Sequence, residues 1–134
     1  MPPTLLAFLV VGVGGAIGAM SRFGLTMATL RYSSVLPVGT LASNLLGCLI
    51  MGGLVDLLAR VSWLGDNGAI TDHTRLLFGV GFCGAFTTLS SFVLELSTMM
   101  QRNESGAAFG YLVVTLVGGY AAFVVGAFIV RSLH

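Results

Sequence analysis

Lysine is absent from this 134-residue sequence, and charged residues of all kinds make up only 8% of it. Soluble domains carry about 25% charged residues, so the composition excludes a protein that faces water on every side. The net charge of +1 excludes the basic patch that nucleic-acid binding requires, and we expect no nucleic-acid partner. The two cysteines, Cys48 and Cys83, lie in apolar runs without metal-ligand spacing and are interpreted as packing residues.

Catalytic motifs are absent as well. The sequence has no phosphate-binding loop, no zinc-ligand spacing and no nucleophile–base pair, so it predicts a protein that is not an enzyme. The N-terminus has no basic residues before its apolar run and no obvious cleavage site, so we expect no removable signal peptide.

Hydrophobic residues, by contrast, make up 56% of the chain. Four segments carry no charge over a length sufficient to cross a bilayer, which takes about 20 apolar residues in a helix. These segments are Thr4–Ser21, Tyr32–Val55, Leu76–Leu94 and Ser105–Val130. They predict an all-α membrane protein in which residues 1–134 form one four-helix transmembrane domain. The expected helices span approximately residues 4–30, 36–58, 75–100 and 106–130.

Small residues recur at spacings of three and four in the expected helices. Such stripes let membrane helices approach closely, because packing drives their association. We therefore expect three helix-packing faces. These are Gly12, Gly15, Ala16 and Ala19 in the first helix, Gly39, Ser43 and Gly47 in the second, and Gly118, Gly119, Ala122 and Gly126 in the fourth.

Two polar side chains interrupt the apolar segments. Arg22 lies within the first helix, where a charge is costly and marks a functional or structural role by default; the alternative is that it snorkels to the interface. Asn44 lies within the second helix, and a buried amide needs hydrogen-bond partners. It either joins helices or offers its amide donors to a passing anion.

The polar stretch between the second and third helices has the pattern of a loop. Asp56 and Arg60, four residues apart at the helix end, predict an exposed ion pair. The expected loop is Val61–Thr74, in which Trp63 suits the aromatic belt of a membrane interface. His73 is interpreted as a surface residue.

The stretch from Gly79 to Glu95 combines glycine, hydroxyls, phenylalanine and a carboxylate inside an apolar segment. Its glycines weaken the helix, and backbone that leaves helical geometry at membrane depth must be buried in protein or line a cavity. One helix face beyond the glycines carries a set of polar and aromatic residues. They are Thr88, Ser91, Phe92 and Glu95. This face predicts either a pore lining or a packed interface with back-bonded hydroxyls.

Arginines are divided almost evenly between the two ends of the expected helices. Arg60, Arg75 and Arg131 lie at one end, and Arg31 and Arg102 lie at the other. Because arginine in short loops sets membrane orientation, this near balance predicts a chain that inserts in both orientations and pairs with an inverted copy of itself.

Together these motifs resemble the Fluc fluoride-channel family, also called CrcB-like proteins, over essentially the whole chain. The matching motifs are Gly18-Ala-Met-Ser-Arg22, Gly39-Thr-Leu-Ala-Ser-Asn44 and Gly81-Phe-Cys-Gly-Ala-Phe-Thr-Thr-Leu-Ser-Ser-Phe-Val-Leu-Glu95. The resemblance implies an antiparallel dual-topology homodimer in the bacterial inner membrane, with the third helix broken at mid-membrane. It also implies two fluoride pores, a central structural Na⁺ and passive fluoride export that lowers cytoplasmic fluoride toxicity.

The resemblance also implies roles for individual residues. Backbone carbonyls of Gly84 and Thr87 would hold the sodium ion, and Arg22 and Glu95 would lie at the vestibule or mouth of the pore. The implied pore residues are Asn44, Ser90, Ser91, Phe92, Tyr111 and Thr115. Leu89 departs from the family, which has a second phenylalanine there. In the family, the fourth membrane-spanning helix tends to carry hydroxyls at four-residue intervals after a tyrosine. Here Tyr111 and Thr115 match that pattern, but Gly119 and Phe123 occupy the next two positions.

Two other functions fit a chain of this kind. A small four-helix multidrug transporter has a similar length and can also insert in both orientations, but it relies on a carboxylate in its first helix, where this chain has Arg22. A protein that only assembles through its small-residue stripes is the second alternative.

Overall fold

The fold is given by a computed structural model that describes residues 3–65 and 68–133. All regular elements in this part of the chain are helices. They are α1 (Pro3–Thr29), η1 (Leu30–Tyr32), α2 (Val38–Trp63), α3 (Ala69–Thr74), η2 (Arg75–Cys83), α4 (Gly84–Phe86), α5 (Leu89–Gln101) and α6 (Ser105–Ser132). Four stretches are long and apolar enough to cross a membrane, which confirms the predicted class. These stretches are Pro3–Tyr32, Val38–Trp63, Thr71–Gln101 and Ser105–Ser132.

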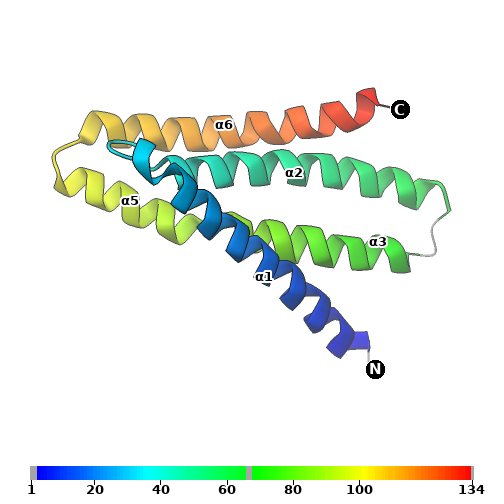
Figure 1. Ribbon diagram of the computed structural model, residues 1–134. Coiled ribbons are helices and arrows are strands. Elements are labelled where there is room, and N and C mark those ends of the chain that lie inside the picture. Colours follow the sequence, from blue (N-terminus) through cyan, green and yellow to red (C-terminus); the bar gives the residue numbers. More distant parts are fainter. Residues whose placement is uncertain (1–2, 66–67, 134) are drawn as a thin grey trace.

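The helices form a bundle with two distinct ends. In Figure 1, α2 and α6 run side by side, α3 and α5 lie in a second row, and α1 crosses obliquely to pack against η2 and α4. The start of α1 and the end of α6 lie at the end of the bundle where α2 ends and α3 begins. Element η1 and the turn from α5 to α6 lie at the opposite end.

The connection between α2 and α3 is shorter than predicted. Helix α2 continues to Trp63 and α3 begins at Ala69, so the expected loop Val61–Thr74 was wrong at both ends. The polar residues Asp72 and His73, read as loop residues, are exposed side chains on a helix. Trp63 is 86% exposed at the end of its helix, as a residue of the interfacial belt is expected to be.

Element η2 is a π-helix of nine residues, Arg75–Cys83. Such segments are rare and usually only a single turn long. Its backbone approaches α1 closely at Gly14 and Gly18, where an added Cβ would collide with the carbonyls of Leu77 and Phe82. The predicted packing face of the first helix is therefore only partly right within this chain: Gly15 lies against Gly81, but a Cβ on Gly12 would meet nothing within 4 Å and Ala16 is exposed.

Helices α2 and α6 pack through glycine, and the face predicted on the fourth span is used: Gly119 and Gly126 are buried and lie against α2. The face predicted on the second span is also buried, but it packs elsewhere, because a Cβ on Gly47 would meet Thr87 and one on Gly39 would meet Thr26. A Cβ on Gly126 would overlap the Leu49 carbonyl, and one on Gly52 would overlap the Phe123 carbonyl. The close contact between these two helices is therefore backbone against backbone.

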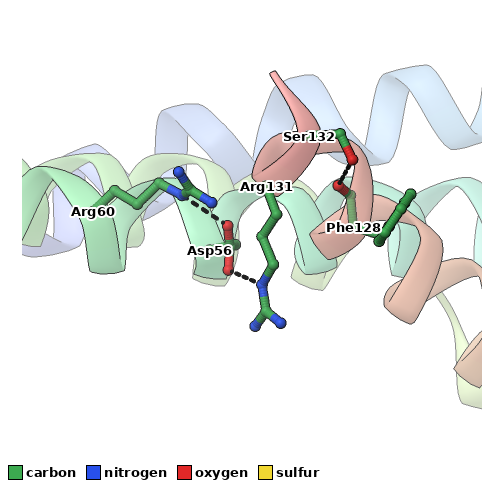
Figure 2. Close-up of polar contacts among 5 residues, drawn as sticks. All are labelled: Asp56, Arg60, Phe128, Arg131 and Ser132. Atoms are coloured by element: carbon green, nitrogen blue, oxygen red, sulfur yellow. Dashed lines mark hydrogen bonds and ion pairs between the residues drawn. The ribbon is translucent and has the colours of Figure 1, made fainter. Parts of the chain in front are cut away.

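An ion-pair cluster joins α2 and α6 near their ends by the α2–α3 turn. Figure 2 shows Asp56 between two arginines, with Arg60 Nε 3.0 Å from Asp56 Oδ2 and Arg131 Nε 2.7 Å from Asp56 Oδ1. The predicted pair with Arg60 is confirmed, but it is partly buried rather than exposed, since the Asp56 side chain is only 12% exposed. Arg131 could not be anticipated, because it lies 75 residues away in sequence.

At the opposite end, the turn from α5 to α6 closes with a Schellman motif. Asn103 adopts a left-handed conformation (φ 60°), its N–H donates to the Met100 carbonyl, and the Glu104 N–H donates to the Met99 carbonyl. This turn brings α6 back against α5. A small apolar core lies between them, formed by Phe92, Met99, Ala108 and Tyr111.

Candidate functional site

The candidate site is organised by the junction between α4 and α5. Thr87 (φ −86°, ψ 158°) and Thr88 (φ −152°, ψ 126°) are extended, so helical hydrogen bonding stops there. The Asn44 amide bridges the junction: its Nδ2 donates to the Thr88 carbonyl at 3.2 Å, and its Oδ1 accepts from the Thr88 N–H at 2.8 Å. Asn44 therefore joins α2 to the start of α5, as the helix-joining alternative predicts.

Thr88 also caps α5. Its hydroxyl oxygen accepts from the Ser91 N–H at 3.2 Å, in the manner of an N-cap residue. The sequence pattern placed Thr88 on a helix face with Ser91, but it lies just outside the helix. The Thr88 hydroxyl also lies 3.3 Å from the hydroxyls of Ser90 and Ser91, so three hydroxyls cluster at this point.

Arg22 supports the other side of the junction. Its Nε donates to the Ala85 carbonyl at 3.1 Å, and the side chain is partly buried. The snorkelling alternative therefore does not describe it, and among the described residues it forms no ion pair. Arg22 instead satisfies a carbonyl in the last turn before the junction.

The break removes the ordinary helical donors from the carbonyls of the last turn before it, and those of Gly84 and Thr87 are two of them. The Thr88 N–H, which would reach the Gly84 carbonyl in a continuous helix, donates to Asn44 instead. The Ser91 N–H, which would reach the Thr87 carbonyl, donates to the Thr88 hydroxyl. Gly84 and Thr87 are the residues that the family resemblance assigns to a cation, and their carbonyl oxygens are released by local geometry.

A partly buried carboxylate cluster lies two turns further along α5. Glu95 Oε1 accepts from the Thr40 hydroxyl at 2.6 Å, and Glu95 Oε2 accepts from the Tyr111 hydroxyl at 2.7 Å. Tyr111 is 1% exposed, and the Phe92 ring packs edge-on against it with 5.0 Å between ring centroids. The cluster unites α2, α5 and α6.

Replacing Tyr111 with phenylalanine should destabilise the protein measurably. The change leaves Glu95 Oε2 without its hydroxyl donor, and a charge-assisted hydrogen bond within a membrane bundle contributes about 1–2 kcal/mol. The midpoint of thermal unfolding in detergent should fall for Tyr111→Phe. It should stay unchanged for the matched variant Tyr120→Phe, because Tyr120 is 74% exposed. Equal midpoints for both variants would contradict a stabilising role for the Glu95–Tyr111 bond.

The predicted pore residues are only partly brought together. Phe92, Tyr111 and Glu95 form one cluster, while Ser91 lies nearer the junction with Thr88. The Thr115 hydroxyl is buried and has no hydrogen-bond partner among the described residues. Leu89 is 74% exposed and Ser90 is also exposed, so both point away from the cluster within this chain.

Thr40 is the site residue that sequence reasoning missed. It is 6% exposed and its hydroxyl holds the carboxylate of Glu95, 55 residues away. The only available signal was its place in the Gly39–Asn44 motif, between a predicted packing glycine and the predicted amide. Nothing local distinguishes its hydroxyl from those of the other threonines.

Comparison with known proteins places this arrangement in a family. The model of the family described as "CrcB-like protein, Camphor Resistance (CrcB)" matches residues 9–127, which include every residue of the junction and of the carboxylate cluster. The chain belongs to the CrcB-like family. As a CrcB-like protein it is a multi-pass membrane protein, with four apolar helices long enough to span.

Several relatives of this CrcB-like chain carry a functional name. A protein from Francisella philomiragia subsp. philomiragia is 36% identical over 129 residues, and one from Francisella tularensis subsp. tularensis is 37% identical over 129 residues. Each alignment covers 96% of this chain and 98% of the relative. A third, from Azobacteroides pseudotrichonymphae, is 36% identical over 123 residues, and the alignment covers 91% of this chain and 94% of the relative. All three are named "Fluoride-specific ion channel FluC".

Proposed function

We propose that this CrcB-like chain is a fluoride-selective ion channel of the bacterial inner membrane. It would let fluoride leave the cell passively and so lower fluoride toxicity in the cytoplasm. The observation that carries the proposal is the match, over almost the whole chain, to proteins named fluoride-specific ion channels. The family of ion channels to which it belongs is not a class of enzymes.

The chemistry of the site is compatible with a small anion. Fluoride is strongly hydrated, so a pore must replace its lost water with hydrogen-bond donors, because unsatisfied polar groups in hydrocarbon cost several kcal/mol each. The unpartnered hydroxyl of Thr115 is a free donor in a buried position. Asn44 has a second amide hydrogen beyond the one that it gives to Thr88. We propose that these groups, with Ser90, Ser91, Tyr111 and the edge of Phe92, line the path.

We further propose that Na⁺ binds at the junction. Hard cations prefer oxygen ligands, and the carbonyls of Gly84 and Thr87 are among those that lose their helical donors at the break. The described residues contain no cluster of three or more histidine, cysteine or acidic side chains that could hold a metal. Backbone oxygens are therefore the ligands that this part of the chain offers, and a bound sodium ion would supply a fixed positive charge near the pore.

The active unit that we propose is an antiparallel homodimer of two inverted copies, with the junction at mid-membrane. The exposure of Leu89 and Ser90 at the start of α5 supports this proposal. A second copy of the chain would cover these two residues. Leu89 would then face the second copy, in the place where the family resemblance implies a phenylalanine. Glu95 would lie towards one mouth of the path, and Arg22, which binds the Ala85 carbonyl, would lie where a vestibule meets the junction.

The alternative functions have less support. A multidrug transporter of this size needs an acidic residue in its first helix, and Pro3–Thr29 contains none. A protein that serves only for assembly would not need the polar cluster of Thr40, Glu95 and Tyr111 inside the bundle.

Fluoride efflux from proteoliposomes tests the proposed function. A fluoride electrode should record rapid release from vesicles that contain the purified protein, and chloride-loaded vesicles should release little chloride. Proton-coupled uptake of a lipophilic cation without fluoride release would favour the transporter. Vesicles that carry neither activity would favour the assembly protein.

Within this assay, Phe92→Ile should slow fluoride efflux strongly. Isoleucine removes the positive ring edge that can contact an anion, and it removes the edge-on contact with Tyr111. Phe109→Ile is the matched control, because Phe109 is 68% exposed on α6. Leu112 would be an unsuitable control, since it packs against the Phe92 cluster. Equal slowing of efflux by the two phenylalanine variants would contradict the assignment of Phe92 to the pore lining.

A further inference from the structure

A cleft of about 280 Å³ opens beside the carboxylate cluster, at the end of the bundle that holds η1 and the α5–α6 turn. Its walls come from the end of α1, from the connector before α2 and from the last turns of α5. Thr40 and Glu95 both line it, so the partly buried carboxylate is not sealed inside the bundle. We call this space the Arg102 cleft. The residues that define it here are Thr26, Ser34, Thr40, Glu95, Thr98 and Arg102.

The threonine hydroxyls of the Arg102 cleft give their protons to other protein groups. Thr26 donates to the Arg22 carbonyl at 3.0 Å, and Thr98 donates to the Leu94 carbonyl at 2.9 Å. Thr40 donates to Glu95. A hydroxyl has one proton to donate and two lone pairs, so these side chains present acceptors to the cleft. Together with the carboxylate of Glu95, they make walls that repel an anion.

Arg102 is the one cation among the described residues that line the cleft. It is the C-cap of α5, seven residues or about two helical turns beyond Glu95, with Thr98 between them. The side chain is exposed, and it takes part in neither of the ion pairs formed by the described residues. Its guanidinium group carries five N–H donors and a permanent positive charge, and no other described residue that lines the cleft carries a positive charge.

We propose that the Arg102 cleft is an anion mouth of the conduction path, in which Arg102 offsets the charge of Glu95 and attracts the permeating anion from water. The proposal rests on the proposed channel function. Charged clefts raise the local concentration of oppositely charged ions and speed their entry, and the effect falls with ionic strength. Arg102 therefore acts on the rate at low salt and does not hold the helices together.

Fluoride efflux at two ionic strengths tests this role. At about 0.01 M salt, where charges act over roughly 30 Å, Arg102→Gln should slow efflux about tenfold, and Arg102→Lys should keep most of the rate. At about 1 M salt, where the range is roughly 3 Å, all three proteins should conduct at similar rates. Arg31→Gln is the matched control, because Arg31 lies at the same end beside Tyr32 but does not line the cleft. Its efflux at low salt should fall much less than that of Arg102→Gln, because Arg31 stands outside the cleft; an equal fall would contradict a specific role for Arg102.

Chemical restoration of the charge gives an independent measurement. Arg102→Cys should conduct slowly at low salt, a cationic methanethiosulfonate reagent should restore the rate, and an anionic one should lower it further. The unmodified protein, which carries Cys48 and Cys83, gives the background reaction. The proposal is overturned if both reagents have the same effect, or if Arg102→Gln loses the same fraction of its rate at both salt concentrations. Failure of the channel function itself would show differently, because the unmodified protein would release no fluoride.

Discussion

Asn44→Asp should abolish fluoride conduction. The substitution keeps the shape of the side chain but replaces the amide donor with an oxygen, which then faces the Thr88 carbonyl that Asn44 Nδ2 now binds at 3.2 Å. Leaving that carbonyl unsatisfied costs about 1–3 kcal/mol. A carboxylate on the proposed path would also repel fluoride. Two unit charges 4 Å apart interact by about 4 kcal/mol at an effective dielectric constant of 20, which corresponds to roughly a thousandfold in rate.

The measurement is the initial rate of fluoride efflux from vesicles with matched protein content, and we expect a fall of about a hundredfold or more. Asn103→Asp is the matched control, because Asn103 occupies an exposed turn where aspartate also tolerates the left-handed conformation. Efflux from Asn44→Asp at the rate of the unmodified protein would exclude Asn44 from the pore lining. It would also contradict the importance of its bridge to Thr88.

Gly126→Leu should prevent stable folding. A Cβ at this position would already overlap the Leu49 carbonyl, and the Gly53 backbone nitrogen lies 3.0 Å away. Because both obstacles are backbone atoms of α2, no rotamer change makes room, and α2 and α6 must separate. Forcing extra atoms into a packed interior costs about 1–3 kcal/mol for a single methylene and more for a larger group.

We expect the midpoint of thermal unfolding in detergent to fall by roughly 10 °C or more, or the protein to be recovered only as aggregate. Gly110→Leu on the same helix is the control, since nothing lies within 4 Å of a Cβ built there. A Gly126→Leu protein with an unchanged midpoint would show that the backbone contact between α2 and α6 does not limit stability.

The sequence predicts the spans well because the bilayer imposes a simple rule on them. Every backbone group must be satisfied inside a helix, so long uncharged segments have one solution. Contacts between helices are less predictable. Gly14 and Gly18 have the same four-residue spacing as the stripe predicted on the first helix, and spacing alone does not show which set faces a neighbour.

The sequence predicts which residue types form the candidate site, but not the hydrogen bonds between helices that join them. The polar stretch that ends at Glu95 stands out in sequence, because hydroxyls and a carboxylate are unusual in an apolar span. The donors that converge on Glu95 come from Thr40 and Tyr111, on two other helices, and no local pattern links them. The π-helical geometry of Arg75–Cys83, which packs against α1, is equally hidden, because no local sequence pattern marks it.

The glycine contact between α2 and α6 has a consequence for how this chain can vary through evolution. In a water-soluble protein, large buried side chains are the positions least tolerant of change. Here the interface depends on the absence of side chains at Gly52 and Gly126, while many leucine and valine side chains point outward from the chain. A mutational scan should therefore find free exchange among the bulky aliphatic residues and strong selection against adding a single methyl group to either glycine.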